Sequence, residues 1–304
     1  MRLLTRSDFD GLACGALLKY LGMIDCWKFV HPKDIQDGLV EVNTNDILAN
    51  IPYAEGCSMW FDQHVDEQDQ PEESVSHTGV VRPMDSAARV IFEHYNGKEK
   101  MPHMAEMIDA VDKVDSACLT VEEILNPTGW ILLGFIMDPR TGLGRFRNFR
   151  ISNYDLMSSL IDLCSKQTID EILQNPDVED RLSLYFEQEA LFRRMLRDHT
   201  VIDGNIIFTD LRGVETIYSG NRFLKYSLYP EQNISIWVVD GRNKKNCAIA
   251  VGHSIIQRTS QTDIGSLMLQ YGGGGHRKGG TCQVDNADAS RVIAEISEKI
   301  KQDG

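Results

Sequence analysis

Short apolar runs alternate with helical patterns through the first half of the chain. The apolar runs, each closed by polar or turn-forming residues, lie at 1–5, 26–32, 46–53 and 57–62. Apolar residues with helical spacing lie at 12–22, 85–96 and 101–117. Strands that alternate with helices are typical of a mostly parallel sheet, so the pattern predicts an α/β domain.

The second half of the chain has a different pattern. Periodicity is lost over 126–150, and an amphipathic stretch from about 177 to 198 then predicts a long helix that connects two domains. Beyond this stretch, β-rich runs separated by Asp-Gly turns precede a glycine cluster and a final helical pattern. We therefore predict a first domain over 1–176, a connecting helix over 177–199 and a smaller α/β domain over 200–304.

The composition excludes some classes of protein. The net charge of −14 over 304 residues argues against nonspecific binding of long duplex nucleic acid. A local arginine cluster or a metal ion can still attract an anionic substrate. No apolar run approaches the ~20 residues that cross a bilayer, and the N-terminus lacks a secretory signal, so we expect no membrane partner. The seven cysteines, without a Cys-x-x-Cys pair, predict reduced thiols and a cytoplasmic location.

Polar side chains follow two of the predicted strands. Asp8 and Asp10 come after the first strand, and in an extended segment residues at i and i+2 project to the same side. Facing carboxylates repel unless a cation lies between them, and Mg²⁺ or Mn²⁺ prefers such oxygen ligands. The alternative is a turn in which Asp10 caps a helix. Asp62, Gln63 and His64 follow another strand, and they are either a solvated strand end or part of the same site, because parallel strands end at one edge.

Two further groups could carry chemistry. Asp109, Asp112 and Asp115 are either an acidic helix face or, if one folds back to this edge, a metal ligand. The glycines Gly272–Gly275 precede His276, Arg277 and Lys278. Such glycines let the backbone approach a ligand closely, and their exposed N–H groups can bind a phosphate of that ligand. The alternative is a flexible linker.

Taken together, SDFDG, FDQH, the helix with Asp115 and the late GGGGHRKGG resemble the DHH phosphoesterase family with its associated C-terminal domain. The resemblance extends over nearly the whole chain in the same order, and GGGGH is its most specific part. It implies a hydrolase with a mostly parallel-sheet DHH domain, a connecting helix and a smaller C-terminal domain, with Mn²⁺ or Mg²⁺ as cofactor. Family members include single-strand exonucleases, oligoribonucleases, 3′-phosphonucleotide phosphatases, cyclic-dinucleotide phosphodiesterases and exopolyphosphatases.

The resemblance also assigns roles to residues. The implied metal ligands are Asp8, Asp10, Asn50, Gln63 and Asp115, with Asp112 as the second choice for the last position. The implied catalytic residues are His64 and Asp62. The implied substrate-binding residues are Gly273, Gly274, Gly275, His276, Arg277, Arg222 and Ser254.

Three positions depart from the family pattern. Gln63 replaces a histidine that usually binds metal, Asn50 replaces a bridging aspartate, and Leu4 replaces a histidine that often precedes the first aspartates. An amide oxygen can coordinate a hard cation but brings no charge. The implied set therefore suits one Mg²⁺ or Mn²⁺ ion better than two.

The sequence thus predicts a metal-dependent phosphohydrolase or phosphodiesterase. The expected substrates are small phosphate esters such as short single-stranded oligonucleotides or 3′-phosphonucleotides. The alternatives are a catalytically weakened nucleotide-binding regulator, favoured by Asn50 and Gln63, and an exopolyphosphatase-like hydrolase. Arginines interleaved with phenylalanines over 138–150 either contact a nucleotide or form a surface loop. A homodimer is a family-level expectation.

Overall fold

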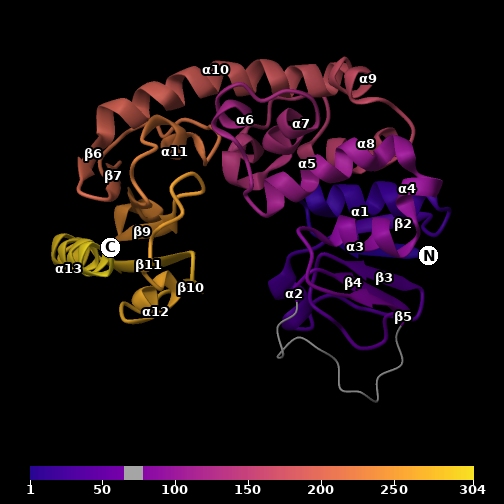
Figure 1. Ribbon diagram of the computed structural model, residues 1–304, viewed down its shortest axis with the longest axis horizontal. Coiled ribbons are helices and arrows are strands. Elements are labelled where there is room, and N and C mark those ends of the chain that lie inside the picture. The colour runs from indigo at the N-terminus through magenta and orange to yellow at the C-terminus, as the bar shows by residue number, and fades with distance from the viewer. Residues whose placement is uncertain (65–77) are drawn as a thin grey trace. The chain divides into compact units, whose positions relative to one another are not determined.

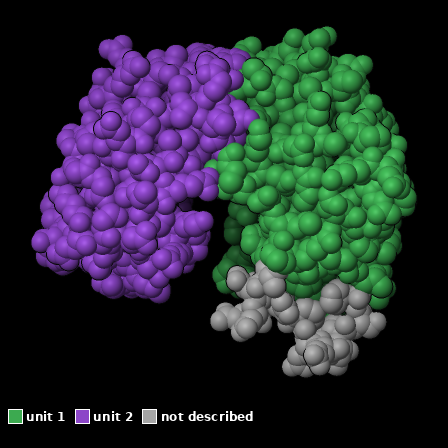
Figure 2. All heavy atoms as spheres, in the orientation of Figure 1, with its two compact units in different colours: residues 1–118, 127–184 green, residues 119–126, 185–304 purple. Residues whose placement is uncertain are grey.

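The computed structural model describes residues 1–64 and 78–304 and divides into two compact units. The first unit comprises residues 1–118 and 127–184, and the second comprises 119–126 and 185–304 (Figure 2). Helix α10 (Pro176–His199) belongs in part to each unit. No helix among the described residues is both long enough and apolar enough to span a membrane.

The first unit is built on a five-stranded sheet in the order β2-β1-β3-β4-β5. The strands are β1 (Arg2–Thr5), β2 (Cys26–Phe29), β3 (Asp46–Ala49), β4 (Met59–Asp62) and β5 (Thr78–Val81). Every neighbouring pair is parallel. This arrangement confirms the predicted α/β class.

Helices cover one face of this sheet, with α1 (Phe9–Tyr20) and α3 (Ala87–His94) in contact with the strands (Figure 1). The other helical segments of the unit are α2 (Pro32–Gln36), α4 (Gly97–Lys100), η1 (Pro102–Met104), α5 (Ala105–Asp115), α7 (Gly129–Met137), η2 (Pro139–Thr141), η3 (Leu143–Arg145), α8 (Asn153–Cys164) and α9 (Ile169–Leu173). A Cβ atom on Gly15 would lie 2.7 Å from Ile161 Cδ1, so this glycine lets α1 and α8 pack closely.

The loss of periodicity over 126–150 does not mean the absence of a helix. Helix α7 has the sequence GWILLGFIM, and most of its residues are buried. A helix that is apolar on all faces has no amphipathic pattern, so the loss of periodicity could not reveal it. The residues after it, 138–150, do form short turns and bends.

The second unit contains a six-stranded sheet in the order β10-β11-β9-β8-β7-β6. Its strands are β6 (Thr200–Asp203), β7 (Ile206–Asp210), β8 (Ile234–Asp240), β9 (Asn246–His253), β10 (Gly274–His276) and β11 (Gly279–Asp285). Only the β7–β8 pair is parallel. The helical segments are α6 (Val121–Leu125), α11 (Leu224–Leu228), η4 (Arg242–Lys244), α12 (Ile264–Leu269) and α13 (Ala289–Asp303). Residues of α12 and α13 share one core with the strands, while Phe192 of α10 and Leu224 of α11 belong to another. The unit is of the α/β class, as predicted, but it comprises residues 119–126 and 185–304 and so extends beyond the predicted range of 200–304.

Candidate active site

The parallel sheet brings three separate parts of the sequence to one edge. Strands β1, β3 and β4 are neighbours, and each is followed by a polar residue singled out from the sequence. Asp8 follows β1, Asn50 follows β3, and Asp62 ends β4 before Gln63. Asn50 and Gln63 are both more than nine-tenths buried. The shared strand direction explains why these residues lie at one edge, which the sequence predicted for Asp8 and residues 62–64 and the family resemblance implied for Asn50.

The two aspartates of SDFDG are not in an extended segment. Asp8 is the N-cap of α1, and its Oδ1 accepts a hydrogen bond from Gly11 N at 3.0 Å. Asp10 lies in the first turn of the helix, and its carboxylate accepts hydrogen bonds from Ala87 N and Ala88 N at the start of α3. The geometric argument for the pair was therefore wrong, and the cap expected from Asp10 is made by Asp8. Both carboxylates nevertheless line one cavity.

The two amides that replace usual family ligands donate hydrogen bonds to carboxylates. Asn50 Nδ2 donates to Asp8 Oδ1 at 3.0 Å, from a residue with a left-handed backbone (φ 57°) that asparagine tolerates well. Gln63 Nε2 donates to Asp115 Oδ2 at 3.2 Å. The other amide atom, Gln63 Oε1, is buried and accepts no hydrogen bond from any described residue. A buried acceptor without a donor is costly, and a cation would satisfy it.

The three aspartates of α5 have different surroundings. Asp109 pairs with Arg89 Nη2 at 2.5 Å. Asp112 accepts hydrogen bonds from Ser86 Oγ at 2.6 Å and Arg89 Nε at 2.7 Å. Asp115 lines the same cavity as Asp8 and Asp10. The structure thus brings Asp115, rather than Asp112, to the site; its role as a metal ligand stays a prediction.

His64 is held by Asp62. The Asp62 Oδ1 atom lies 2.8 Å from His64 Nδ1 and accepts a hydrogen bond from His64 N at 3.0 Å. The Asp62 side chain is 5% exposed and that of His64 is 58% exposed. A buried carboxylate of this kind fixes the orientation and tautomer of an imidazole that reaches solvent.

The cavity between these elements is small. It is lined by Asp8, Phe9, Asp10, Val111, Val114, Asp115, Gly134, Asp138 and Arg140. About 10 Å³ of it can take the centre of a water molecule, which is room for about one water or one ion. Reasoning from the sequence missed Asp138 and placed Arg140 only among the arginines of a loop. The Asp-Pro-Arg turn directly after an apolar run was the signal available in the sequence.

Burial and mutual repulsion disfavour the charged form of these carboxylates. Burial, followed by the charges of Asp115 and Asp8, raises the pKa of Asp10 well above its ordinary value. Burial also raises the pKa of Asp8, although Arg6 Nε, 3.0 Å from Asp8 Oδ2, partly offsets it. Burial and the charge of Asp8 raise the pKa of Asp115 to about 6. A bound cation would relieve this repulsion.

The donor set fits one hard cation. Carboxylate and amide oxygens are the ligands that Mg²⁺ and Mn²⁺ prefer, and Gln63 Oε1 lacks a partner among the described residues. Over residues 1–64 and 78–304, no three aspartate, glutamate, histidine or cysteine side chains converge as a ready-made metal site. The residues therefore supply the oxygen atoms that such a cation prefers, and several of these oxygens accept hydrogen bonds from the protein.

The glycine cluster of the second unit forms a β-hairpin. In this hairpin Gly275 of β10 pairs with Gly280 of β11. A Cβ atom on Gly275, whose φ is 154°, would lie 2.3 Å from Gly279 O, and one on Gly273 would lie 2.1 Å from Thr281 O. The sequence predicted that the glycine backbone approaches a ligand closely. At Gly273 and Gly275 it instead approaches the neighbouring strand.

The cationic residues after the glycines lie at the turn of this hairpin. His276, Arg277 and Lys278 are exposed, and His276 Nδ1 accepts a hydrogen bond from Lys278 N at 3.2 Å. The neighbouring His253 is partly buried, and burial followed by the charges of Lys278, Arg277 and His276 lowers its pKa. Gly274 borders open space, because, apart from Gly274 itself and its two chain neighbours, no described residue has an atom within 4 Å of the position that a Cβ atom would take. The turn therefore offers positive charge beside accessible backbone.

The two other predicted substrate-binding residues lie elsewhere in the second unit. Arg222 stacks over the Phe223 ring, with 3.9 Å between Cζ and the ring centroid. Ser254 is 3% exposed, and its Oγ accepts hydrogen bonds from Ile256 N and Gln257 N. Ser254 thus stabilises a turn, which leaves Arg222 as the better placed of the two for contact with an anion.

The arginines of the 138–150 segment separate into two groups. Arg140 lines the carboxylate cavity. Arg150 pairs with Asp177, and Phe149 is covered by Arg181, whose Cζ lies 3.8 Å from the ring centroid. The second group supports the surface-loop alternative for that part of the segment.

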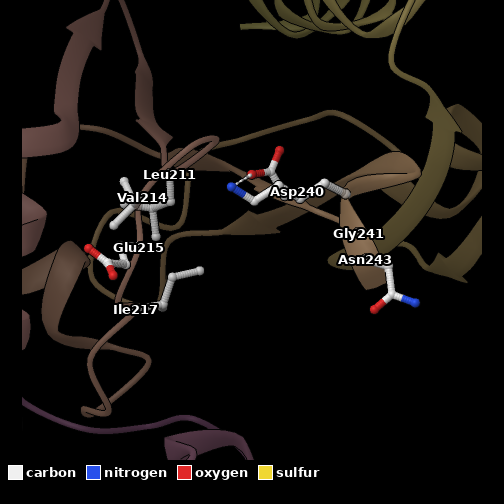
Figure 3. Close-up of a pocket in the computed structure, with 8 residues that line it drawn as sticks. Leu211, Val214, Glu215, Ile217, Asp240, Gly241 and Asn243 are labelled. Atoms are coloured by element: carbon white, nitrogen blue, oxygen red, sulfur yellow. Dashed lines mark ion pairs between the residues drawn. The ribbon is translucent and has the colours of Figure 1, made fainter.

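The second unit also has a larger cavity, of about 420 Å³ (Figure 3). Apolar side chains such as Leu211, Val214 and Ile217 form much of its wall. Its charged groups include Asp240, which accepts a hydrogen bond from Gly213 N at 2.8 Å, and Glu215. Two acids and few cations do not suit a phosphate, and none of the predicted site residues lies there.

Comparison with known proteins defines first the class of the fold. No protein-family model and no curated protein sequence matches the chain. The DHH domain of a member of a family of ribosomal proteins matches with a TM-score of 0.53 and 12% identity, over 98% of this chain and 86% of that one. RecJ from Thermus thermophilus, in complex with Mn²⁺, matches with a TM-score of 0.50 and 13% identity, over 99% of this chain and 52% of that one. The fold is that of DHH-domain proteins.

A solved structure of higher identity defines the family. The pGpG-specific phosphodiesterase PggH from Vibrio cholerae is 49% identical, with a TM-score of 0.91 over 100% of this chain and 99% of that one. This chain belongs to the DHH family of phosphoesterases, as the motifs predicted, and is a hydrolase.

Proposed function

We propose that this chain is a Mg²⁺- or Mn²⁺-dependent phosphodiesterase that hydrolyses short 5′-phosphorylated dinucleotides, with pGpG as the first candidate. The observation that carries the proposal is the 49% identity, over the full length, with a pGpG-specific phosphodiesterase. The net charge of −14 supports a small substrate over a long anionic polymer. Three carboxylates around one cavity support a cation at the reaction site.

The residues of the first unit would hold the ion and the reacting groups. Asp8, Asp10 and Asp115 would bind the cation, and Gln63 Oε1 would add a neutral oxygen. A bound Mg²⁺ or Mn²⁺ supplies a water of lowered pKa for attack on phosphorus. His64, oriented by Asp62, would contact the phosphoryl oxygens or pass a proton to the leaving oxygen.

In the second unit, the family resemblance implies residues that bind phosphate. The exposed turn with His276 and Arg277 offers positive charge, and the adjacent Gly274 leaves room beside the backbone. Arg222 is a further candidate for this contact. Such preorganised donors stabilise charge without rearrangement during the reaction.

The reaction consumes one water for each phosphodiester bond. The water oxygen forms a bond to phosphorus while the bond from phosphorus to the 3′-oxygen breaks, and the 3′-oxygen takes a proton. Hydrolysis of pGpG would therefore release two molecules of GMP.

Hydrolysis of a panel of phosphate esters tests the proposal. The panel contains pGpG, pApA, a pentanucleotide, a 3′-phosphonucleotide, a cyclic dinucleotide and polyphosphate, each with Mn²⁺ or with EDTA. We expect turnover of pGpG with Mn²⁺, its loss in Asp8→Ala, and its retention in Asp109→Asn, a charge-matched control in a surface ion pair. Turnover of polyphosphate alone would favour the exopolyphosphatase alternative. Nucleotide binding without any turnover would indicate a regulatory protein.

We also infer a cytoplasmic location and a homodimer. None of the seven cysteines, all of which lie in the described residues, forms a disulfide, which supports a reducing compartment. The dimer rests on the family resemblance, and light scattering of the purified protein would test it.

A further inference from the structure

The chain places one of its own cations at the carboxylate cavity. Arg140 lines this cavity with Asp8, Asp10 and Asp115. Its backbone N and its Nε both donate to Asp138 Oδ1 at 2.8 Å. Asp138 is 5% exposed and caps the short η2 turn, so Arg140 is held by a buried anchor.

The outer part of the Arg140 guanidinium is available to a ligand. Its Nη1 and Nη2 groups make no hydrogen bond to the described residues, and the side chain is 46% exposed. A planar guanidinium with two such amino groups matches two oxygens of a phosphate. The Nε bond to Asp138 limits rotation and so reduces the entropy lost when a phosphate binds.

The same cavity offers little support for a second metal ion. In two-metal sites the ions lie about 3.5–4 Å apart and share bridging anions. Here the space has room for about one ion. Asn50, at the bridging position, brings no charge and donates an N–H to Asp8 instead. A phosphodiester at this site would therefore need a second positive charge from another source.

We propose that Arg140, anchored by Asp138, takes the place of a second metal ion and binds the non-bridging oxygens of the scissile phosphate in a single-cation centre. This inference rests on the proposed function. Arg140 is then a catalytic residue, and Asp138 is a positioning residue that acts through it.

Metal stoichiometry and a comparison of two backgrounds test the proposal. Calorimetric titration with Mn²⁺ should give one ion per chain for the wild-type protein and for Arg140→Gln. On pGpG, Arg140→Gln should lower kcat by about 10²–10³, as the loss of a transition-state donor does. Arg147→Gln removes the same charge from an exposed residue of the same segment and should change kcat less than about twofold.

The second background restores the usual ligands. The double variant Asn50→Asp, Gln63→His should bind two ions, and in it the loss of kcat caused by Arg140→Gln should fall below about tenfold. Two ions in the wild-type protein, or an equal loss in both backgrounds, would overturn the proposal.

The proposal can fail separately from the proposed function. If no phosphate ester were hydrolysed, the proposed function would be wrong. The role of Arg140 would still be tested by the number of bound ions and by the affinity for pGpG. That affinity, measured with Ca²⁺ in place of Mn²⁺, should fall at least about tenfold in Arg140→Gln. Equal affinity of the wild-type protein and Arg140→Gln for pGpG would show that Arg140 does not bind the phosphate.

Discussion

Removal of one negative charge from the carboxylate cluster should stabilise the metal-free protein. In Asp115→Asn the hydrogen bond from Gln63 Nε2 can be kept, because the asparagine oxygen also accepts. The raised pKa of Asp115, about 6, means that folding disfavours its charged form. For a fully shielded group, an increase from 3.8 to about 6 costs about 3 kcal/mol at pH 8. Asp115 is exposed on one side, so we expect screening to leave about 1.5 kcal/mol.

The sign of the effect follows from the direction of the pKa change. The unfavourable contribution of Asp115 is fully present above pH 6 and disappears as the pH falls towards 4. In EDTA, the melting temperature of Asp115→Asn should therefore exceed that of the wild-type protein by about 3–5 °C at pH 8, and by about half of that at pH 5. Saturating Mn²⁺ should reverse the order, because the variant has lost a ligand.

The control for this experiment is Asp109→Asn on the same helix. Asp109 pairs with Arg89, so its removal should leave the melting temperature unchanged or lower it slightly. A lower melting temperature of Asp115→Asn in EDTA at pH 8, or a gain of equal size at pH 5, would refute the electrostatic reasoning.

Three further predictions concern binding, folding and reactivity. Because protons compete for Asp115, with its pKa of about 6, Mn²⁺ affinity measured by calorimetry should fall as the pH is lowered from 7.5 to 5.5; a constant affinity would exclude this carboxylate as a ligand. Gly275→Ala should destabilise the second unit by about 2 kcal/mol or more in denaturant unfolding, because the new Cβ would meet a carbonyl of the facing strand, whereas Gly274→Ala should cost less than about 1 kcal/mol. Burial lowers the pKa of Lys225 to about 8. Amine acylation at pH 8, followed by mass spectrometry, should therefore modify Lys225 faster per exposed area than the surface Lys301. Slower modification of Lys225 than of Lys301 would contradict the lowered pKa.

Much of the architecture follows from local pattern. Runs of apolar residues closed by turn formers predicted most strands of both sheets, because burial of a strand needs only a short stretch of side chains. Helix α7 escaped detection because a helix buried on all sides has no polar face. The positions of Asp8 and Gln63 at one edge also followed, since parallel strands all end on the same side, whereas Asn50 was implied by the family resemblance.

The sequence by itself therefore determined the fold class, the family and the set of polar residues at the sheet edge. Only the tertiary structure decided that Asp8 caps α1, that Asp115 rather than Asp112 reaches the cavity, and that Arg140 lies beside them. Strand direction and helix periodicity are properties of neighbouring residues, and a sequence displays them directly. The position of Arg140 depends on how α7 packs beside α5, and the spacing of residues along the chain does not record that packing.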